Sequence, residues 1–245
     1  MNISPTQSEV QGGIDRLQRR RLSISIHSCS RDASVALALG GKVIRYIPLD
    51  PQNRTAATIS PAVRSLLDDV RTADQPLDYI AVTDGPGSFT GLRIGVTTAK
   101  TLGYALGISV VAVDSLAVMA RNLWESRPDA PAVMVAMNAY RGQVFAAHWT
   151  RQEWESAKDC GDFSNQSRVV LSVDWTADVA AADRTCIIAA EPIVACRFEP
   201  GRVLAIEPNA IDVAELGEQI ASKGLFLSPM QLLHDTSETA PPKRN

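Results

Sequence analysis

Apolar and polar residues alternate along the first half of this chain in blocks whose lengths are typical of strands and helices. Short apolar stretches predict strands, and apolar residues that recur every three or four positions predict helices. Gly40-Gly41 lies between two apolar stretches and predicts a tight hairpin turn. The predicted elements are, in order, strands over 22–28, 33–39 and 42–49, a helix over 55–71, a strand over 77–83, a helix over 92–107, a strand over 110–113 and a helix over 115–124.

From Pro131 onward the pattern is weaker. Residues 151–168 are polar and predict an irregular connection. The remaining predicted elements are strands over 132–137, 143–149, 169–173, 185–190 and 202–206 and a helix over 211–222. We therefore expect a flexible extension over 1–21, a first lobe over 22–130, a smaller second lobe over 131–235 and a disordered tail over 236–245. A three-stranded meander followed by alternating helices and strands is the arrangement of a ribonuclease H-like lobe, in the α/β class.

A glycine-rich loop joins the strand predicted over 77–83 to the helix that follows it. The loop and the helix start read Gly85-Pro86-Gly87-Ser88-Phe89-Thr90-Gly91-Leu92-Arg93-Ile94-Gly95. In open α/β sheets ligands bind beyond the carboxyl ends of the strands, and the free N–H groups of a helix start can hold an anion. The candidate contacts for an anion or a nucleotide are Gly85, Gly87, Ser88 and Thr90. We also expect one of the two hydroxyl groups to cap the helix.

Small residues form a stripe along that helix. Gly91, Gly95, Ala99, Gly103 and Gly107 recur every four residues and therefore share one face. An interior glycine costs about 0.8 to 1 kcal/mol relative to alanine, so close packing must offset the cost. Two alternatives remain open: the stripe packs against the chain's own sheet, or it is reserved for another subunit.

Three segments resemble the TsaB (YeaZ) family. They are the glycine loop GPGSFTGLRIG, the hairpin RLSISIHSCSRDASVAL and the run Met137-Asn138-Ala139-Tyr140-Arg141-Gly142-Gln143-Val144-Phe145. The resemblance implies the actin, sugar-kinase and Hsp70 ATPase (ASKHA) fold, with two ribonuclease H-like lobes of which the second is reduced. It also implies a non-catalytic subunit of the machinery that makes N6-threonylcarbamoyladenosine (t6A) beside the tRNA anticodon.

The resemblance further implies the partners. They would be a catalytic paralogue, TsaD, and an ATPase, TsaE, with a homodimer when the chain is alone, only indirect contact with tRNA, and a cytoplasmic location. The helices over 55–71 and 91–107 would present their apolar face to TsaD. The interface residues expected on this basis are Gly91, Leu92, Arg93, Gly95, Val96, Ala99, Leu102 and Gly103, with Ile59, Val63 and Leu66.

The composition of the chain argues against several classes of function. The 245-residue chain carries a formal net charge of -3, which argues against a protein that clamps nucleic acid by itself. Four cysteines without a C-x-x-C pair are typical of reduced thiols rather than a disulfide framework or a zinc site. No apolar run approaches the roughly 18 residues of a membrane helix.

The sequence predicts no catalytic activity for this chain by itself. The glycine loop lacks the lysine of a P-loop, and the three histidines form no H-x-x-x-H or H-E-x-x-H pair, so we expect no catalytic residues and no metal. His27-Ser28 stands where ASKHA proteins commonly have an acidic residue for magnesium-bound ATP, so ATP and magnesium would be used by the partner subunits and not by this chain. We expect His27 to be half-buried. The alternatives are a small-molecule kinase or ATP-binding protein of the same superfamily, or an orphan scaffold; nothing in the sequence supports a peptidase.

Overall fold

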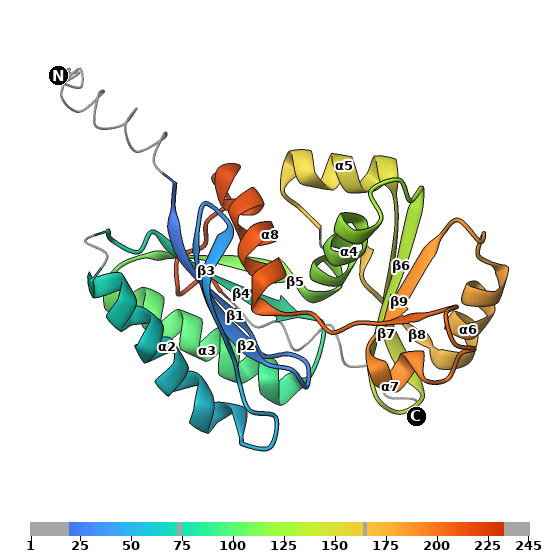
Figure 1. Cartoon of the computed structure of the whole chain (residues 1–245), viewed down its shortest axis with the longest axis horizontal. Helices are drawn as coiled ribbons and strands as arrows, with labels where there is room; N and C mark the ends of the chain where they lie inside the picture. Colours follow the sequence, from blue (N-terminus) through green and yellow to red (C-terminus); the bar gives the residue numbers. More distant parts are fainter. Residues whose placement is uncertain (1–19, 73–74, 164–165, 233–245) are drawn as a thin grey trace.

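The computed structural model describes residues 20–72, 75–163 and 166–232. These residues form two five-stranded sheets with helices packed on their faces (Figure 1). The expected tail over 236–245 and nearly all of the expected extension over 1–21 lie outside the described residues. Within the described residues, no helix combines the length and the apolar character that a membrane span needs.

The first sheet contains the predicted meander. Its strands are β1 (Leu22–His27), β2 (Ser34–Leu39), β3 (Lys42–Pro48), β4 (Tyr79–Gly85) and β5 (Ser109–Asp114), in the order β3-β2-β1-β4-β5. β1 pairs antiparallel with β2 and parallel with β4, and β4 pairs parallel with β5. Helices α2 (Thr55–Thr72) and α3 (Phe89–Leu106) share a hydrophobic core with one face of this sheet.

The second sheet has the same topology. Its strands are β6 (Ala132–Asn138), β7 (Gln143–Thr150), β8 (Arg168–Leu171), β9 (Ile187–Ala190) and β10 (Leu204–Ala205), in the order β10-β9-β6-β7-β8. β6 pairs antiparallel with β7 and parallel with β9, which repeats the relation of β1 to β2 and β4. β8, β9 and β10 are short, so the prediction of two ribonuclease H-like lobes with a reduced second lobe is confirmed.

Two helices connect the lobes by crossing between them. α4 (Ser115–Ser126) follows β5 in the first sheet but makes its most extensive contacts with β6 of the second. α8 (Ala210–Ser222) follows β10 in the second sheet but packs on β1, β2 and β3 of the first. The expected second lobe over 131–235 therefore contains a helix whose packing belongs to the first sheet. Both helices contribute to one core between the two sheets (Figure 1).

The prediction of an irregular connection over 151–168 is wrong for its first ten residues. α5 (Arg151–Cys160) begins with a capping box, in which the Thr150 hydroxyl accepts from the Glu153 N–H and the Glu153 carboxylate accepts from the Thr150 N–H. Trp154 is buried and anchors the helix, and Gly161 ends it in the left-handed conformation. The polar residues lie on the exposed side of α5, and Trp154 is the one aromatic side chain that packs its other side into the core.

Two further helices were not predicted. They are α6 (Ser172–Ala181) and the short α7 (Pro192–Ala195). The strand predicted over 169–173 ends at Leu171, and α6 begins directly after it. α6 buries Trp175 and Val179, which lie four residues apart, so its apolar signal is too sparse to stand out from the strands around it.

Candidate functional site

The glycine loop lies at the carboxyl end of β4, where it was predicted. The Ser88 side chain caps α3 by accepting from the Gly91 N–H at 3.3 Å, which confirms the expected hydroxyl cap. The Ser88 N–H donates to the Cys29 carbonyl at 2.7 Å, and the Leu92 N–H donates to the Ser88 carbonyl at 2.8 Å. The N–H groups of Ser88, Gly91 and Leu92 thus have acceptors within the chain.

The glycines allow this loop to press against the turn that follows β1. A Cβ atom on Gly87 would lie 2.6 Å from the Cys29 carbonyl oxygen. A Cβ atom on Gly91 would overlap the Ser28 carbonyl oxygen, which belongs to the backbone and cannot rotate away. The Ser28 hydroxyl in turn donates to the Gly91 carbonyl at 2.8 Å. Close approach of backbone to backbone therefore explains both glycines, and anion binding by this loop remains a prediction.

The small-residue stripe continues this packing. A Cβ atom on Gly95 would overlap the Ser28 hydroxyl, and Ala99 is fully buried. At the far end, a Cβ atom on Gly103 would lie 2.9 Å from the Pro229 ring and 3.0 Å from the Ile108 carbonyl oxygen. The structure therefore shows Gly91, Gly95, Ala99 and Gly103 packed inside the chain, whereas Gly107 is exposed and ends α3 as its left-handed C-cap.

The expected interface residues lie mostly inside the chain itself. Arg93 is exposed and Leu102 is half-buried. The others are buried against the chain's own core: Gly91, Leu92, Gly95, Val96, Ala99 and Gly103 on α3, and Ile59, Val63 and Leu66 on α2. A residue that already fills the core of its own lobe is not available to a partner.

The outer face of α3 is apolar in part and has no acidic residue. On this face Phe89 and Tyr104 are 47% and 77% exposed, whereas Leu106, which is 47% exposed at the end of the helix, follows Ala99 by seven residues and lies on the side of the small-residue stripe. The Arg93 guanidinium lies over the Phe89 ring, 4.0 Å from its centroid, as a cation–π pair. Lys100 adds a second positive charge to the helix. The sequence did not identify Phe89, Tyr104 and Lys100 as candidates, because its strongest signal on this helix is the four-residue repeat of small residues on the buried face.

Polar residues gather where the carboxyl ends of strands from both sheets meet. His27 ends β1, Asp114 ends β5 and Asn138 ends β6, while Glu191 directly follows β9. The Glu191 carboxylate accepts from the Asn138 N–H at 2.8 Å. The Asp114 carboxylate caps α4 by accepting from the Ala117 N–H at 2.8 Å. We call this group, including Asp84 in β4 and Glu207 beyond β10, the interlobe polar cluster.

His27 is buried completely, so the expectation of a half-buried side chain is wrong. Its Nε2 atom lies 2.8 Å from the Ser30 hydroxyl, and its Nδ1 atom lies 3.5 Å from the Thr83 hydroxyl. Desolvation lowers the pKa of His27 to about 3, so the imidazole is neutral at physiological pH. The Ser30–His27 contact resembles half of a catalytic triad, but a base with this pKa is poorly matched to activate a hydroxyl group near neutral pH.

The carboxyl groups of the interlobe polar cluster have raised pKa values. Desolvation raises the pKa of Asp114 to about 7, and the negative charge of Asp84 adds to the effect. Desolvation also raises the pKa of Glu207 to about 7, with contributions from Glu191 and Asp32. Asp84 reaches the surface, yet the protein around it raises its pKa to about 6. Within the described residues, no group of three or more His, Cys, Asp or Glu side chains is arranged to hold a metal ion.

The raised pKa of Asp114 predicts the direction of one stability change. Because the folded-state pKa lies above the unfolded value, the protonated carboxyl favours the fold, and this advantage is lost as the pH rises from about 4 to about 7. Asp114→Asn keeps the cap without the charge, so we expect it to raise the free energy of unfolding at pH 8 by on the order of 2 kcal/mol. At pH 4 the gain should vanish.

Urea denaturation of wild type and Asp114→Asn at both pH values measures this difference. Asp129→Asn, at an exposed position, is the matched control and should have little effect at either pH. A gain that is equal at pH 4 and pH 8 would contradict the assignment of the effect to the Asp114 charge.

The fold defines the class of protein. Two sheets of identical strand order, joined by two crossing helices and meeting at the carboxyl ends of their strands, form the two-lobed ASKHA-like fold. Comparison with known proteins places the chain more narrowly. Residues 46–162 match the family model described as TsaD, tRNA N6-adenosine threonylcarbamoyltransferase.

Two curated relatives carry the name tRNA threonylcarbamoyladenosine biosynthesis protein TsaB. The Bacillus subtilis protein is 40% identical over 123 residues, which cover 50% of this chain and 52% of the relative. The Escherichia coli protein is 32% identical over 130 residues, which cover 53% and 55%. The matched region thus spans about half the length of these relatives.

A solved structure extends the likeness to most of the chain. The Pseudomonas aeruginosa structure described as an uncharacterized protein with similarity to peptidase YEAZ has a TM-score of 0.67 and 26% identity, and the match covers 86% of this chain and 96% of the other. A second structure, YeaZ from the same organism, has a TM-score of 0.66 at 23% identity, covers 87% and 98%, and shows the same fold. Together these matches show that the chain is similar to TsaB (YeaZ) proteins.

Proposed function

We propose that this chain is a non-catalytic subunit for t6A formation, which activates threonylcarbamoyl transfer to the adenosine beside the tRNA anticodon. The name of the curated relatives supports the pathway. The arrangement of the glycine loop supports the non-catalytic role, because N–H groups of Ser88, Gly91 and Leu92 are bonded within the chain. His27, buried and neutral, stands where a magnesium-bound nucleotide would require an acid.

The observation that carries the proposal is the outer face of α3. Phe89 and Tyr104 expose aromatic surface on a helix whose other face is fixed to the first sheet. Aromatic residues on a rigid element are typical anchors of protein interfaces. We propose that this face, with Arg93, binds a TsaD-like catalytic paralogue and, in its absence, a second copy of the chain. In the complex the subunit would help to recruit a TsaE-like ATPase, contact tRNA only indirectly and act in the cytoplasm.

Tyr104→Asp is expected to weaken binding to the TsaD-like partner at least tenfold and to leave the monomer folded. The side chain is 77% exposed, so its replacement removes a contact anchor without opening the core. Isothermal titration calorimetry with the partner measures the affinity, and circular dichroism confirms the fold.

Val173→Asp is the matched control, because Val173 is 71% exposed at the start of α6 in the second lobe. It should bind the partner as wild type does. Equal loss in both variants, or loss in neither, would contradict the assignment of the docking face to α3.

The kinase alternative is tested by calorimetry with magnesium-ATP and the chain alone, for which we expect no binding.

A further inference from the structure

Four side chains on the outer side of α3 form one narrow row. Successive residues of an α-helix turn by about 100°, so Phe89, Arg93, Lys100 and Tyr104 lie within about 60° of one another around the helix axis. Phe89, Arg93 and Tyr104 are exposed, and Lys100 is half-buried. We call these four residues the docking row. It has an aromatic ring at each end and two positive charges between the rings.

The two cations of the docking row have no acidic neighbour on their own helix. Residues 85–113 contain no Asp or Glu. The neighbouring helix α2 carries two acids that are paired with other cations. Asp68 pairs with Arg71 on the same helix, and Asp69 pairs with Arg45 of β3. The docking row is therefore a positive strip on a chain whose formal net charge is -3.

The order of residues in the docking row decides what happens when two copies of it meet. The order is symmetric, because Phe89 and Tyr104 lie equally far from its midpoint, as do Arg93 and Lys100. In an antiparallel pair of α3 helices, Phe89 of one copy would face Tyr104 of the other, which is favourable for aromatic rings. Arg93 of one copy would face Lys100 of the other, which places like charges together. A parallel pair would also oppose cation to cation.

We propose that Arg93 and Lys100 select the partner that docks on α3: they repel a second copy of the chain and bind a protein surface with acidic side chains between two apolar contacts. This inference rests on the proposed function, because it concerns the docking face assigned there. Like charges placed opposite each other disfavour a wrong partner, and complementary charges favour the right one. The same two side chains therefore weaken self-association and strengthen binding to the partner.

A nucleic acid fits the docking row less well than an acidic protein does. Affinity for RNA comes largely from neutralising many phosphates, and α3 supplies only Arg93 and Lys100. The chain as a whole is also acidic. We therefore expect no saturable binding of tRNA to the chain alone at about 150 mM salt, measured by fluorescence anisotropy.

Opposite responses to salt distinguish partner binding from self-association. Binding to the TsaD-like protein of the same organism, measured by calorimetry, should weaken about tenfold when sodium chloride rises from about 50 mM to about 500 mM. Self-association of the chain, measured by sedimentation velocity, should strengthen about threefold over the same range, because salt screens the repulsion.

Removal of the two charges should act in the same directions. Arg93→Gln with Lys100→Gln should weaken partner binding about tenfold, strengthen self-association about fivefold and make self-association nearly independent of salt. Lys100→Gln alone leaves the contact between Arg93 and Phe89 in place and should produce smaller changes of the same sign.

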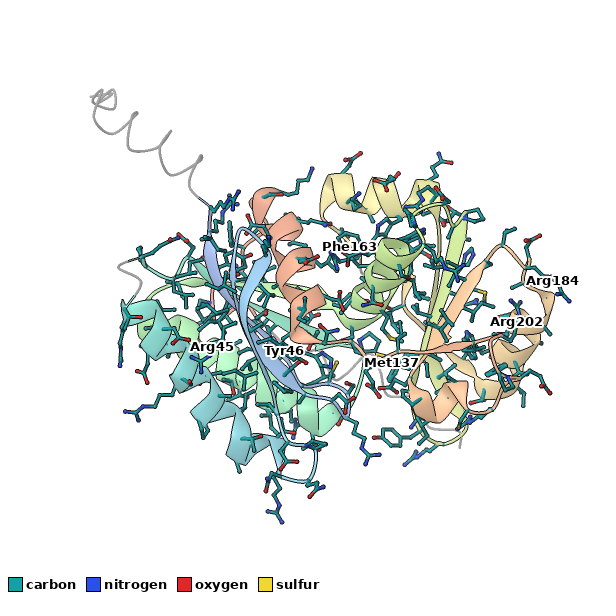
Figure 2. All side chains as sticks on the ribbon, in the orientation of Figure 1. Arg45, Tyr46, Met137, Phe163, Arg184 and Arg202 are labelled. Carbon is teal, nitrogen blue, oxygen red and sulfur yellow. The ribbon has the colours of Figure 1, made fainter. Side chains whose placement is uncertain are left out.

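Arg184→Gln with Arg197→Gln is the matched control, because it removes the same charge from exposed positions of the second lobe. Arg184 lies at the outer end of that lobe (Figure 2). This variant should bind the partner and self-associate as wild type does. Circular dichroism confirms the fold of each variant.

The outcomes separate the charge selection from the proposed function. If Tyr104→Asp weakens partner binding while salt and the two charges do not affect it, the docking face stands and the charge selection is overturned. If none of these variants changes partner binding, the proposed docking face fails as well. A double Gln variant that self-associates no more than wild type, or tRNA binding by the chain alone that this variant abolishes, would also overturn the charge selection.

Discussion

Replacing Gly91 with alanine is expected to destabilise the fold by roughly 3 kcal/mol or more, although it adds a single methyl group. The added Cβ atom would overlap the Ser28 carbonyl oxygen, so β1 and α3 would have to move apart. Urea denaturation followed by circular dichroism measures the loss. Thr97→Ala, at an exposed position of the same helix, should change the free energy of unfolding by less than about 0.5 kcal/mol.

Gly95 provides a second variant that separates a clash from a loss of helix propensity. The nearest atom to an added Cβ there is the Ser28 hydroxyl oxygen, and the next is the Ser28 Cβ at 3.4 Å. Gly95→Ala should therefore be destabilising alone and should be partly rescued by Ser28→Ala, whereas Gly91→Ala should not be rescued. If Gly91→Ala were as stable as wild type, the tight contact between the loop and β1 would not exist in solution.

Replacing Arg121 with methionine is expected to have the second largest effect, a loss of about 3 kcal/mol at pH 7. Arg121 lies on α4 and is paired with Asp212 and Glu215 of α8, so it joins the two crossing helices. Its side chain is 13% exposed, and that of Asp212 is 5% exposed. Methionine preserves much of the packing but leaves the Asp212 carboxylate enclosed without its cation. Thermal unfolding and urea denaturation both measure the loss.

The pH dependence of the free energy of unfolding shows whether the unpaired Asp212 charge causes the loss in Arg121→Met. Burial already raises the pKa of Asp212, and the loss of Arg121 removes an interaction that lowers it, so the variant should recover stability as the pH falls and Asp212 becomes protonated. Adding Asp212→Asn should restore part of the loss at pH 7. Arg71→Met is the matched control, because Arg71 pairs with Asp68 at the surface, where such pairs contribute little. A penalty for Arg121→Met that is the same at pH 4 and pH 7 would assign it to packing.

Much of the fold could be predicted because its signals are local. The meander of the first sheet follows from three apolar stretches and the Gly40-Gly41 turn, and the order of the next elements follows from alternating periodicity. The crossing of α4 and α8 could not be predicted in this way, because which sheet a helix packs on is decided by contacts distant in sequence. α5 was missed because its cap is a pair of polar residues and its buried side consists of Trp154 and Ala157 alone.

In the candidate site, too, features with a local sequence signal could be predicted and features that depend on distant contacts could not. Ser88 was correctly expected to be a capping candidate, since a hydroxyl before a helix is a local signal. The packing of the small-residue stripe inside the chain could not be decided from the sequence, because a four-residue repeat of small residues fits an internal contact and an external one equally well. Asp114 and Glu207 lie 93 positions apart in the sequence, and only the fold shows that one ends β5 of the first sheet and the other follows β10 of the second.

The central claim, that this chain activates threonylcarbamoyl transfer without catalysing it, is tested most directly by reconstitution. The reaction contains tRNA, the TsaD-like and TsaE-like proteins and the threonylcarbamoyl-AMP synthase of the same organism, with and without this chain, and t6A is measured by mass spectrometry of the digested tRNA. We predict that t6A forms only when the chain is present and that Tyr104→Asp reduces the yield while Val173→Asp does not. Equal t6A with and without the chain would contradict the account.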